Sequence, residues 1–115
     1  MKAKKITALL LTAAMAVSML AGCGSKVASD GKVLNVYCWN DEFQRRVQDH
    51  YPGYEIVDAT TGKIGDVTVK WNITPNADNA YQNNLDATLL KQKDAAADDK
   101  IDIFLIEADY ALKYV

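Results

Sequence analysis

Carboxylates are the side chains of this sequence with the clearest capacity for chemistry, and two of them stand two positions apart. Glu107 and Asp109 follow a short apolar run, and paired carboxylates can serve as general acid and general base in hydrolysis. Residues at positions i and i+2 tend to diverge, however, where a strand leads into a helix. The only histidine, His50, belongs to a different predicted element, and no nucleophile and base stand together. Catalysis by this pair is therefore an alternative to binding, and binding is the expectation.

The thiol of Cys23 is a second reactive group, at the end of a Leu-Ala-Gly-Cys box. Residues 1–5 are basic and residues 6–20 are uncharged and mostly apolar, which is the form of a secretory signal peptide. The box is typical of bacterial lipoproteins, in which the cysteine thiolate accepts a diacylglycerol. We therefore expect that residues 1–22 are removed and that Cys23 carries lipid. The alternative is ordinary signal cleavage, with Cys23 as a bystander.

Composition narrows the class of the mature chain. Of the 13 Lys and Arg residues, three lie before position 23, which leaves 10 against 15 Asp and Glu and a net charge of −5. This balance excludes a basic nucleic-acid-binding protein, because phosphate binding needs clustered cations. Two cysteines are too few for a disulfide-stapled miniprotein. Residues 23–32 are small and polar and predict a flexible tether, which precedes one modest domain over residues 33–115.

Three apolar runs predict buried strands at residues 33–39, 67–73 and 101–106. The first and third runs are nearly continuous, as in parallel strands that are covered on both faces, and the second alternates between apolar and polar residues. Cys38 lies inside the first run, where we expect it to be a small hydrophobic residue of the core. Residues 54–66 predict a small hairpin.

Helices are predicted between and after these strands. Asn40 or Asp41 can cap a first helix that ends before Pro52-Gly53, and a second helix runs from about Tyr81 to Lys91. Asp109 can cap a third helix that has only begun at residue 115. An acidic cluster lacks calcium-loop spacing and is expected to be a solvated surface; it consists of Asp94, Asp98, Asp99 and Asp102.

The order β-α-β-α-β predicts an α/β fold in which parallel strands are joined by right-handed crossovers. In such a sheet, ligands bind beyond the carboxyl ends of the strands, where the winding direction reverses. Polar and aromatic residues follow two of these ends, with residues 72–79 nearby: Trp39, Asn40 and Asp41 after the first strand, and Glu107, Asp109 and Tyr110 after the third.

The order of these features carries a resemblance. The lipoprotein box and tether are followed by Val-Leu-Asn-Val-Tyr-Cys-Trp-Asn at 33–40, Pro-Asn-Ala-Asp-Asn-Ala-Tyr-Gln-Asn-Asn-Leu-Asp at 75–86, and Asp-Ile-Phe-Leu-Ile-Glu-Ala-Asp-Tyr at 102–110. The chain thereby resembles the amino-terminal part of the family 1 extracellular solute-binding proteins, the lipoprotein receptors of carbohydrate ABC importers. The resemblance implies a periplasmic-binding-protein-like fold with two lobes, of which residues 33–115 would be the truncated beginning of the first.

The resemblance also implies a site. It assigns ligand contacts to Trp39, Asn40 and Asp41 and to Glu107, Asp109 and Tyr110, and it matches Asn76, Asp78 and Tyr81 more loosely. Such residues suit sugars, because an aromatic face stacks on a pyranose while carboxylates and amides bind its hydroxyls. Each residue has a structural alternative: Trp39 in the core, Asn40 and Asp109 as helix caps, and Tyr110 packed on the lobe.

The implied function is capture of a carbohydrate outside the cytoplasm and its delivery to the permease subunits of an ABC importer. The protein would be held at the outer face of the cell membrane by lipid on Cys23, and would need no catalytic residue, cofactor, metal or nucleic acid. One alternative is a secreted lipoprotein glycosidase or another carbohydrate-active surface protein. A purely structural or adhesive lipoprotein is a further alternative, disfavoured by the polar residues at the strand ends.

Overall fold

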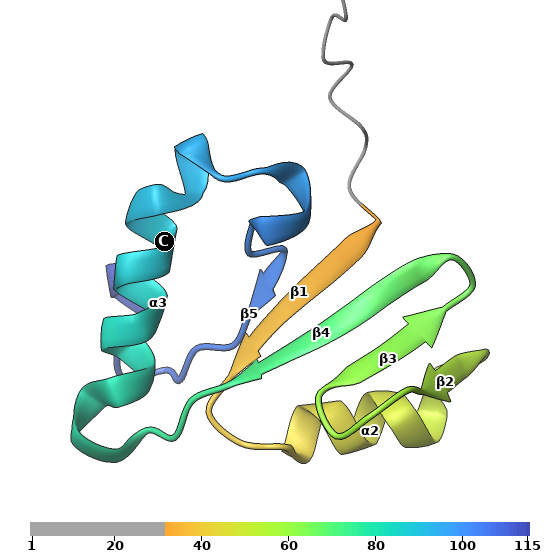
Figure 1. The fold of residues 1–115 in the computed structure, drawn as a ribbon. Coiled ribbons are helices and arrows are strands. Elements are labelled where there is room, and N and C mark those ends of the chain that lie inside the picture. The colour runs from red at the N-terminus through yellow and green to blue at the C-terminus, as the bar shows by residue number, and fades with distance from the viewer. Residues whose placement is uncertain (1–31) are drawn as a thin grey trace, which may run out of the picture.

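The computed structural model describes residues 32–115 (Figure 1). The predicted signal peptide of residues 1–22, the lipid-bearing Cys23 and all of the tether except Lys32 lie outside the described residues. Within residues 32–115, each helix is too short or too polar to cross a bilayer.

A mixed sheet with β1 near its centre organises the fold. β1 (Val33–Cys38) pairs in parallel with β4 (Val67–Ile73) on one side and with β5 (Ile103–Phe104) on the other. β2 (Tyr54–Ile56) and β3 (Thr61–Ile64) form an antiparallel hairpin beyond β4, which gives the order β2-β3-β4-β1-β5 (Figure 1). The predicted α/β class and the parallel pairing of the three main strands are confirmed, and the predicted hairpin makes the sheet mixed.

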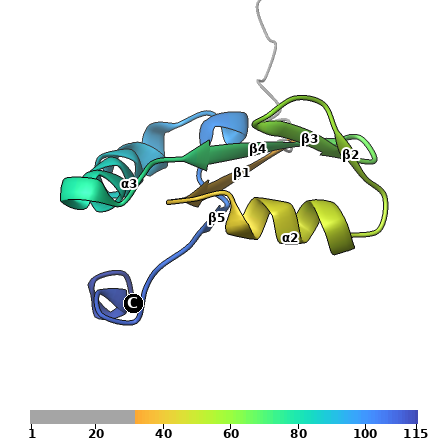
Figure 2. The same ribbon diagram turned by 90° about the horizontal axis from the view of Figure 1, so that it is seen from below.

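Two helices cover opposite faces of this sheet. Successive residues of a strand point to opposite faces, so β1 sends Val36 and Cys38 to one side and Tyr37 to the other. α2 (Glu42–His50) packs Phe43 and Val47 on the first side, along one face of the sheet (Figure 2). α3 (Ala80–Lys91) covers the second side, where buried Tyr81, Leu85 and Ile101 pack with Tyr37 and Phe104. Four short 3-10 turns complete the described chain: η1 (Ala77–Asn79), η2 (Gln92–Asp94), η3 (Ala97–Asp99) and η4 (Ala111–Lys113).

Cys38 belongs to the core between the sheet and α2, where its exposed fraction is 0%. Burial raises the pKa of its thiol to about 11, with a smaller contribution from the charge of Asp41. A thiol in this state is a small hydrophobic group rather than a nucleophile, because the thiolate is the reactive form. The prediction for Cys38 is therefore confirmed.

The third predicted strand is shorter than expected. Only Ile103–Phe104 pairs with β1, and Ile103 is 39% exposed, although the apolar run predicted a buried strand over residues 101–106. The side chain of Gln92 explains the late start, because its amide oxygen accepts a hydrogen bond from the Ile101 N–H (2.9 Å) and its amide nitrogen donates to the Ile101 carbonyl (2.8 Å). These contacts take the place of strand pairing at Ile101.

The predicted helix caps are found only in part. The N-cap position of α2 is Asp41, whose side chain makes no capping bond, while the Glu42 N–H donates to Oδ1 of the preceding Asn40 (3.1 Å). The expectation that Asp109 caps a third helix is wrong, because residues 111–113 form only the single turn η4, whose cap position is Tyr110. No side-chain cap holds that turn within residues 32–115, and one 3-10 turn is too short to be stable by itself.

The acidic cluster is exposed, as expected, but two of its carboxylates also accept hydrogen bonds from the backbone. Asp98 Oδ1 accepts hydrogen bonds from the backbone N–H groups of Lys32 (2.8 Å) and Val33 (3.2 Å). Asp102 Oδ2 accepts a bond from the N–H of Asn35, at 2.7 Å. Two of the four carboxylates thus tie the segment before β5 to the start of β1.

Candidate functional site

The carboxyl ends of β4, β1 and β5 meet at one edge of the sheet, because the three strands are parallel. We call this region the strand-end edge and define it as residues 39–41, 74–76 and 107–110. A backbone bond from Thr74 N–H to the Cys38 carbonyl (2.9 Å) and another from Leu105 N–H to the Tyr37 carbonyl (3.0 Å) keep its three segments together. This is the place where α/β sheets of this kind bind ligands.

A polar contact joins two of the segments. Asn76 Nδ2 donates a hydrogen bond to Glu107 Oε2 at 3.1 Å, and both side chains are half-buried. A carboxylate has about four acceptor positions, so this one can accept further hydrogen bonds from a ligand. The loosely matched Asn76 and the predicted contact Glu107 are therefore brought together.

Trp39, directly after β1, provides an aromatic side chain at the same edge of the sheet. Its ring lies 5.5 Å from the ring of Tyr81, at an interplanar angle of 74°, which is an edge-to-face contact. Tyr81 is fully buried on α3, and its hydroxyl donates to the Leu105 carbonyl at 2.7 Å. Burial is the main reason that the pKa of Tyr81 is raised. Trp39 is itself half-buried, so it is both supported by the core and accessible at the strand-end edge.

Asn40 and Asp41 are exposed, but α2 engages both of them. Asn40 Oδ1 accepts the bond from the Glu42 N–H described above, and the Asp41 carboxylate lies 3.3 Å from Arg45 Nε, one turn along the same helix. An exposed ion pair of this kind contributes little stability. Of the residues after β1, Trp39 is the one whose side chain packs on α3, through Tyr81.

The other two predicted ligand contacts, Asp109 and Tyr110, differ in burial. Asp109 is exposed, and its carboxylate is open to solvent. Tyr110 is half-buried, and its ring centroid lies 6.3 Å from that of Tyr114. Its hydroxyl oxygen is buried and has no hydrogen-bond partner within residues 32–115.

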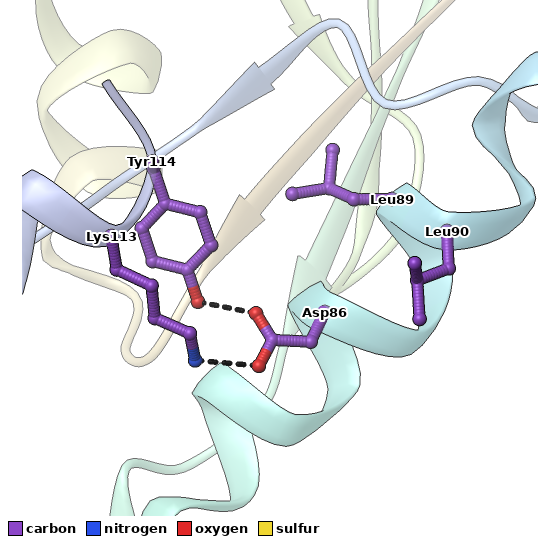
Figure 3. Close-up of a pocket in the computed structure, with 5 residues that line it drawn as sticks. All are labelled: Asp86, Leu89, Leu90, Lys113 and Tyr114. Carbon is purple, nitrogen blue, oxygen red and sulfur yellow. Dashed lines mark hydrogen bonds and ion pairs between the residues drawn. The ribbon is translucent and has the colours of Figure 1, made fainter.

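The segment that carries Glu107, Asp109 and Tyr110 is anchored on α3 through Asp86 (Figure 3). Lys113 Nζ donates to Asp86 Oδ2 at 2.5 Å, and the Tyr114 hydroxyl donates to Asp86 Oδ1 at 2.8 Å. The bonds from Lys113 and then Tyr114 hold the pKa of Asp86 below its ordinary value. Sequence reasoning missed this contact, because residues 27 positions apart on different elements share no local pattern.

Two pockets with largely apolar walls lie away from the strand-end edge. One, of about 420 Å³, surrounds the Asp86 contact and is also lined by Leu89 and Leu90 (Figure 3). Its one carboxylate, Asp86, is already paired with Lys113, so few polar groups in this pocket are free to bond a ligand. The other, of about 310 Å³, is an apolar groove between α2 and the sheet, lined by Leu34, Val36, Phe43, Val47, Tyr51, Ile64, Val69, Trp71 and Ile103.

Within residues 32–115, no group of three or more His, Cys, Asp or Glu side chains is placed to hold a metal ion. Comparison of the chain with models of protein families, with curated proteins and with solved structures finds no match in any of the three. Function is therefore inferred from the chemistry of the strand-end edge and from the motifs of the sequence.

Proposed function

We propose that this chain is the amino-terminal part of an extracytoplasmic solute-binding lipoprotein that captures a carbohydrate and delivers it to the permease subunits of an ABC importer. The observation that carries the proposal is the strand-end edge, where an accessible tryptophan, a carboxylate–amide pair and an exposed carboxylate follow parallel strands. The proposal gives the protein a binding role and no catalytic one.

The side chains at this edge match the chemistry of sugars. The accessible part of Trp39 can stack on the apolar face of a pyranose ring. The Asn76–Glu107 pair, bonded at 3.1 Å, offers an amide and a carboxylate whose positions are already fixed relative to each other. Such preorganisation lowers the entropy lost on binding, since the side chains need no further ordering. Asp109 can accept bonds from hydroxyls at the rim.

The fold is compatible with the first lobe of a periplasmic-binding-protein-like receptor. Such a lobe begins with a parallel β-α-β-α-β unit, and β1, α2, β4, α3 and β5 follow that order here. Among the described residues β5 is an edge strand paired only with β1, so further strands can join the sheet beside it. A second lobe closing over the strand-end edge would complete the site, as hinge closure does in two-lobed binding proteins.

Membrane attachment through Cys23 is part of the proposal, because a receptor must stay near its permease. Two or three acyl chains hold a protein firmly, whereas one holds it marginally. Expression of the precursor in bacteria, followed by detergent partitioning and mass spectrometry, tests the attachment. We expect a lipid-modified mature chain that begins at Cys23. A Cys23→Ser variant with the same membrane partitioning and the same mature mass would contradict it.

A glycosidase is less well supported than a receptor. Such enzymes need two carboxyl groups that face each other across the scissile bond. Glu107 instead bonds the Asn76 amide, while Asp109 is exposed to solvent. The two neighbouring carboxylates thus lie in different surroundings, as expected for residues two positions apart beyond a strand.

Isothermal titration with a saccharide panel tests the proposed function. The protein is the gene product that contains residues 23–115 in its natural reading frame, and the panel contains glucose, xylose, maltose, cellobiose and raffinose. We expect one or more of these to bind with release of heat and to raise the thermal unfolding midpoint. Binding to none of them, together with hydrolysis of a disaccharide, would favour the enzyme over the receptor.

A further inference from the structure

The pairing of β1 with β5 stops earlier than the pairing of β1 with β4. On the β5 side the last backbone bond runs from the Leu105 N–H to the Tyr37 carbonyl, at 3.0 Å. In a continued parallel ladder the next bond would join the Trp39 N–H to the Leu105 carbonyl. Within residues 32–115 that bond does not form, whereas on the β4 side the Thr74 N–H still donates to the Cys38 carbonyl at 2.9 Å.

The hydroxyl of Tyr81 stands where that missing bond would be. Tyr81 is 0% exposed on α3, and its hydroxyl lies 2.7 Å from the Leu105 carbonyl oxygen and 3.1 Å from that of Tyr37. Because a hydroxyl has one proton, the shorter bond to Leu105 is the main one. This is the carbonyl that the Trp39 N–H would need. Burial raises the pKa of Tyr81, so its hydroxyl stays protonated and remains a donor.

The two strands part at the point where the winding direction of the sheet reverses. The crossover from β1 to β4 passes through α2 on one face, and the crossover from β4 to β5 passes through α3 on the other. The reversal therefore lies between β1 and β5, and α/β sheets bind ligands in the crevice at that point. Trp39 continues from β1 and Glu107 follows β5, so the parting separates the segments that carry two predicted ligand contacts.

We propose that Tyr81 is a positioning residue, whose hydroxyl ends the pairing of β1 with β5 and so keeps the strand-end edge open between Trp39 and Glu107. This inference rests on the proposed function. It replaces the direct ligand contact that the resemblance loosely implies for Tyr81, because a side chain that is 0% exposed does not reach a ligand. The ring of Tyr81 also supports the ring of Trp39, 5.5 Å away. One buried side chain thus positions both the backbone and the aromatic ring of residue 39.

Amide hydrogen exchange of the full chain tests the parting without any ligand or substitution. The sequence contains two tryptophans, so NMR of the chain labelled with isotopic tryptophan follows the amides of Trp39 and Trp71. The Trp71 N–H donates to the Thr60 carbonyl at 2.8 Å and is the internal control. After correction for intrinsic rates, we expect the Trp39 N–H to exchange about tenfold or more faster than the Trp71 N–H. Equal protection would mean that the Trp39 N–H is already paired and would overturn the inference.

A matched pair of variants tests the role of the hydroxyl itself. Tyr81→Phe frees the Leu105 carbonyl, whereas Tyr114→Phe removes a hydroxyl that bonds a side chain of α3. We expect Tyr81→Phe to let the Trp39 N–H bond Leu105 and to slow its exchange by about tenfold or more, and Tyr114→Phe to leave it unchanged. A merely stabilising hydroxyl would instead give faster exchange at both Trp39 and Trp71, which would overturn the inference. If Tyr81→Phe does not fold, the wild-type comparison decides alone.

Titration of the natural gene product with the saccharide panel tests the consequence for binding. We expect Tyr81→Phe to lose about tenfold or more in affinity for the saccharide that binds the wild-type protein best, and Tyr114→Phe to keep it. Equal affinity of Tyr81→Phe and the wild type, with slowed exchange at Trp39, would overturn the positioning role and leave the proposed function intact. Failure of the wild-type protein to bind any saccharide in the panel would contradict both.

Discussion

Replacing Asn35 by alanine removes the side chain that joins β1 to the segment before β5. Asn35 is 6% exposed, and its Nδ2 donates to the carbonyl of Asp98 at 2.8 Å and to the carbonyl of Lys100 at 2.9 Å. Its own N–H is bound by Asp102, and alanine would keep that bond. The substitution therefore isolates the two bonds that the side chain makes.

The expected cost follows from those two bonds. Each contributes about 0.5–1.5 kcal/mol net, so their loss lowers the free energy of unfolding by about 1–3 kcal/mol. The whole free energy of unfolding of a natural domain is roughly 5–15 kcal/mol, so this loss would be a large part of it. With a urea dependence of about 2 kcal/mol per molar, a loss of about 2 kcal/mol lowers the midpoint of unfolding by about 1 M.

Urea unfolding followed by circular dichroism measures this change, and Asn72→Ala is the matched control. Asn72 is on the neighbouring strand β4, and its amide makes only a long contact of 3.5 Å with the Lys70 carbonyl. We expect the control to change stability by less than about 0.5 kcal/mol, as for most substitutions away from buried groups. If Asn35→Ala costs no more than Asn72→Ala, the buried amide does not hold the two segments together.

Three further changes probe other contacts of the described domain. The hydrogen bond from Lys113 is the main cause of the lowered pKa of Asp86, so this contact stabilises the folded chain at neutral pH and is lost as the pH falls through that pKa. Asp86→Asn should remove this pH dependence, which NMR of residues 110–115 can follow. The thiol of Cys38 should resist a thiol reagent at pH 8 until urea unfolds the chain, because burial raises its pKa to about 11; rapid labelling of the folded chain would contradict its burial. Gly62→Ala should destabilise by about 1–3 kcal/mol in urea unfolding, because an added Cβ would lie 2.0 Å from the hydroxyl of Tyr54; unchanged stability would mean that the ring moves freely.

The main strands and helices were predictable because their patterns are local. Residues 33–38 and 67–73 have the apolar composition and alternation of strands, and the turn at Pro52-Gly53 follows α2 directly. The parallel pairing of β1, β4 and β5 followed from their alternation with helices, since a crossover through a helix makes parallel neighbours. The hairpin of residues 54–64 was also predicted.

The rest depends on contacts between residues far apart in the sequence. An apolar run predicted a buried third strand, but the pairing of Ile101 is replaced by Gln92, nine positions away. The acidic cluster is the exposed surface that was predicted, but its sequence does not show that Asp98 and Asp102 also bond β1, 65 and 67 positions away. Nothing in the local sequence distinguishes such an aspartate from one that makes no bond to a distant strand.

The sequence predicted where the residues of the candidate site lie better than it predicted which contacts their side chains make. The rule that ligands bind beyond strand ends located Trp39 and Glu107 at one edge, and the structure adds Asn76 as the partner of Glu107. It shows Asn40 Oδ1 accepting a bond from the first residue of α2, and it removes the role of helix cap from Asp109. The unpaired hydroxyl of Tyr110 has no sequence signal, because it depends on how the segment is held.

Saccharide binding by Trp39→Ala and Asp109→Asn in the natural gene product is the most direct measurement of the central claim, which is that the strand-end edge binds a carbohydrate. Truncating a stacked aromatic or a bonded carboxylate should each cost about 1–3 kcal/mol, or roughly tenfold to hundredfold in affinity. Because Trp39 also packs on Tyr81, thermal unfolding must first show that each variant is folded at the temperature of titration. We expect the folded variants to bind more weakly by these factors. Unchanged affinity in both would exclude the strand-end edge as the site and contradict the central claim.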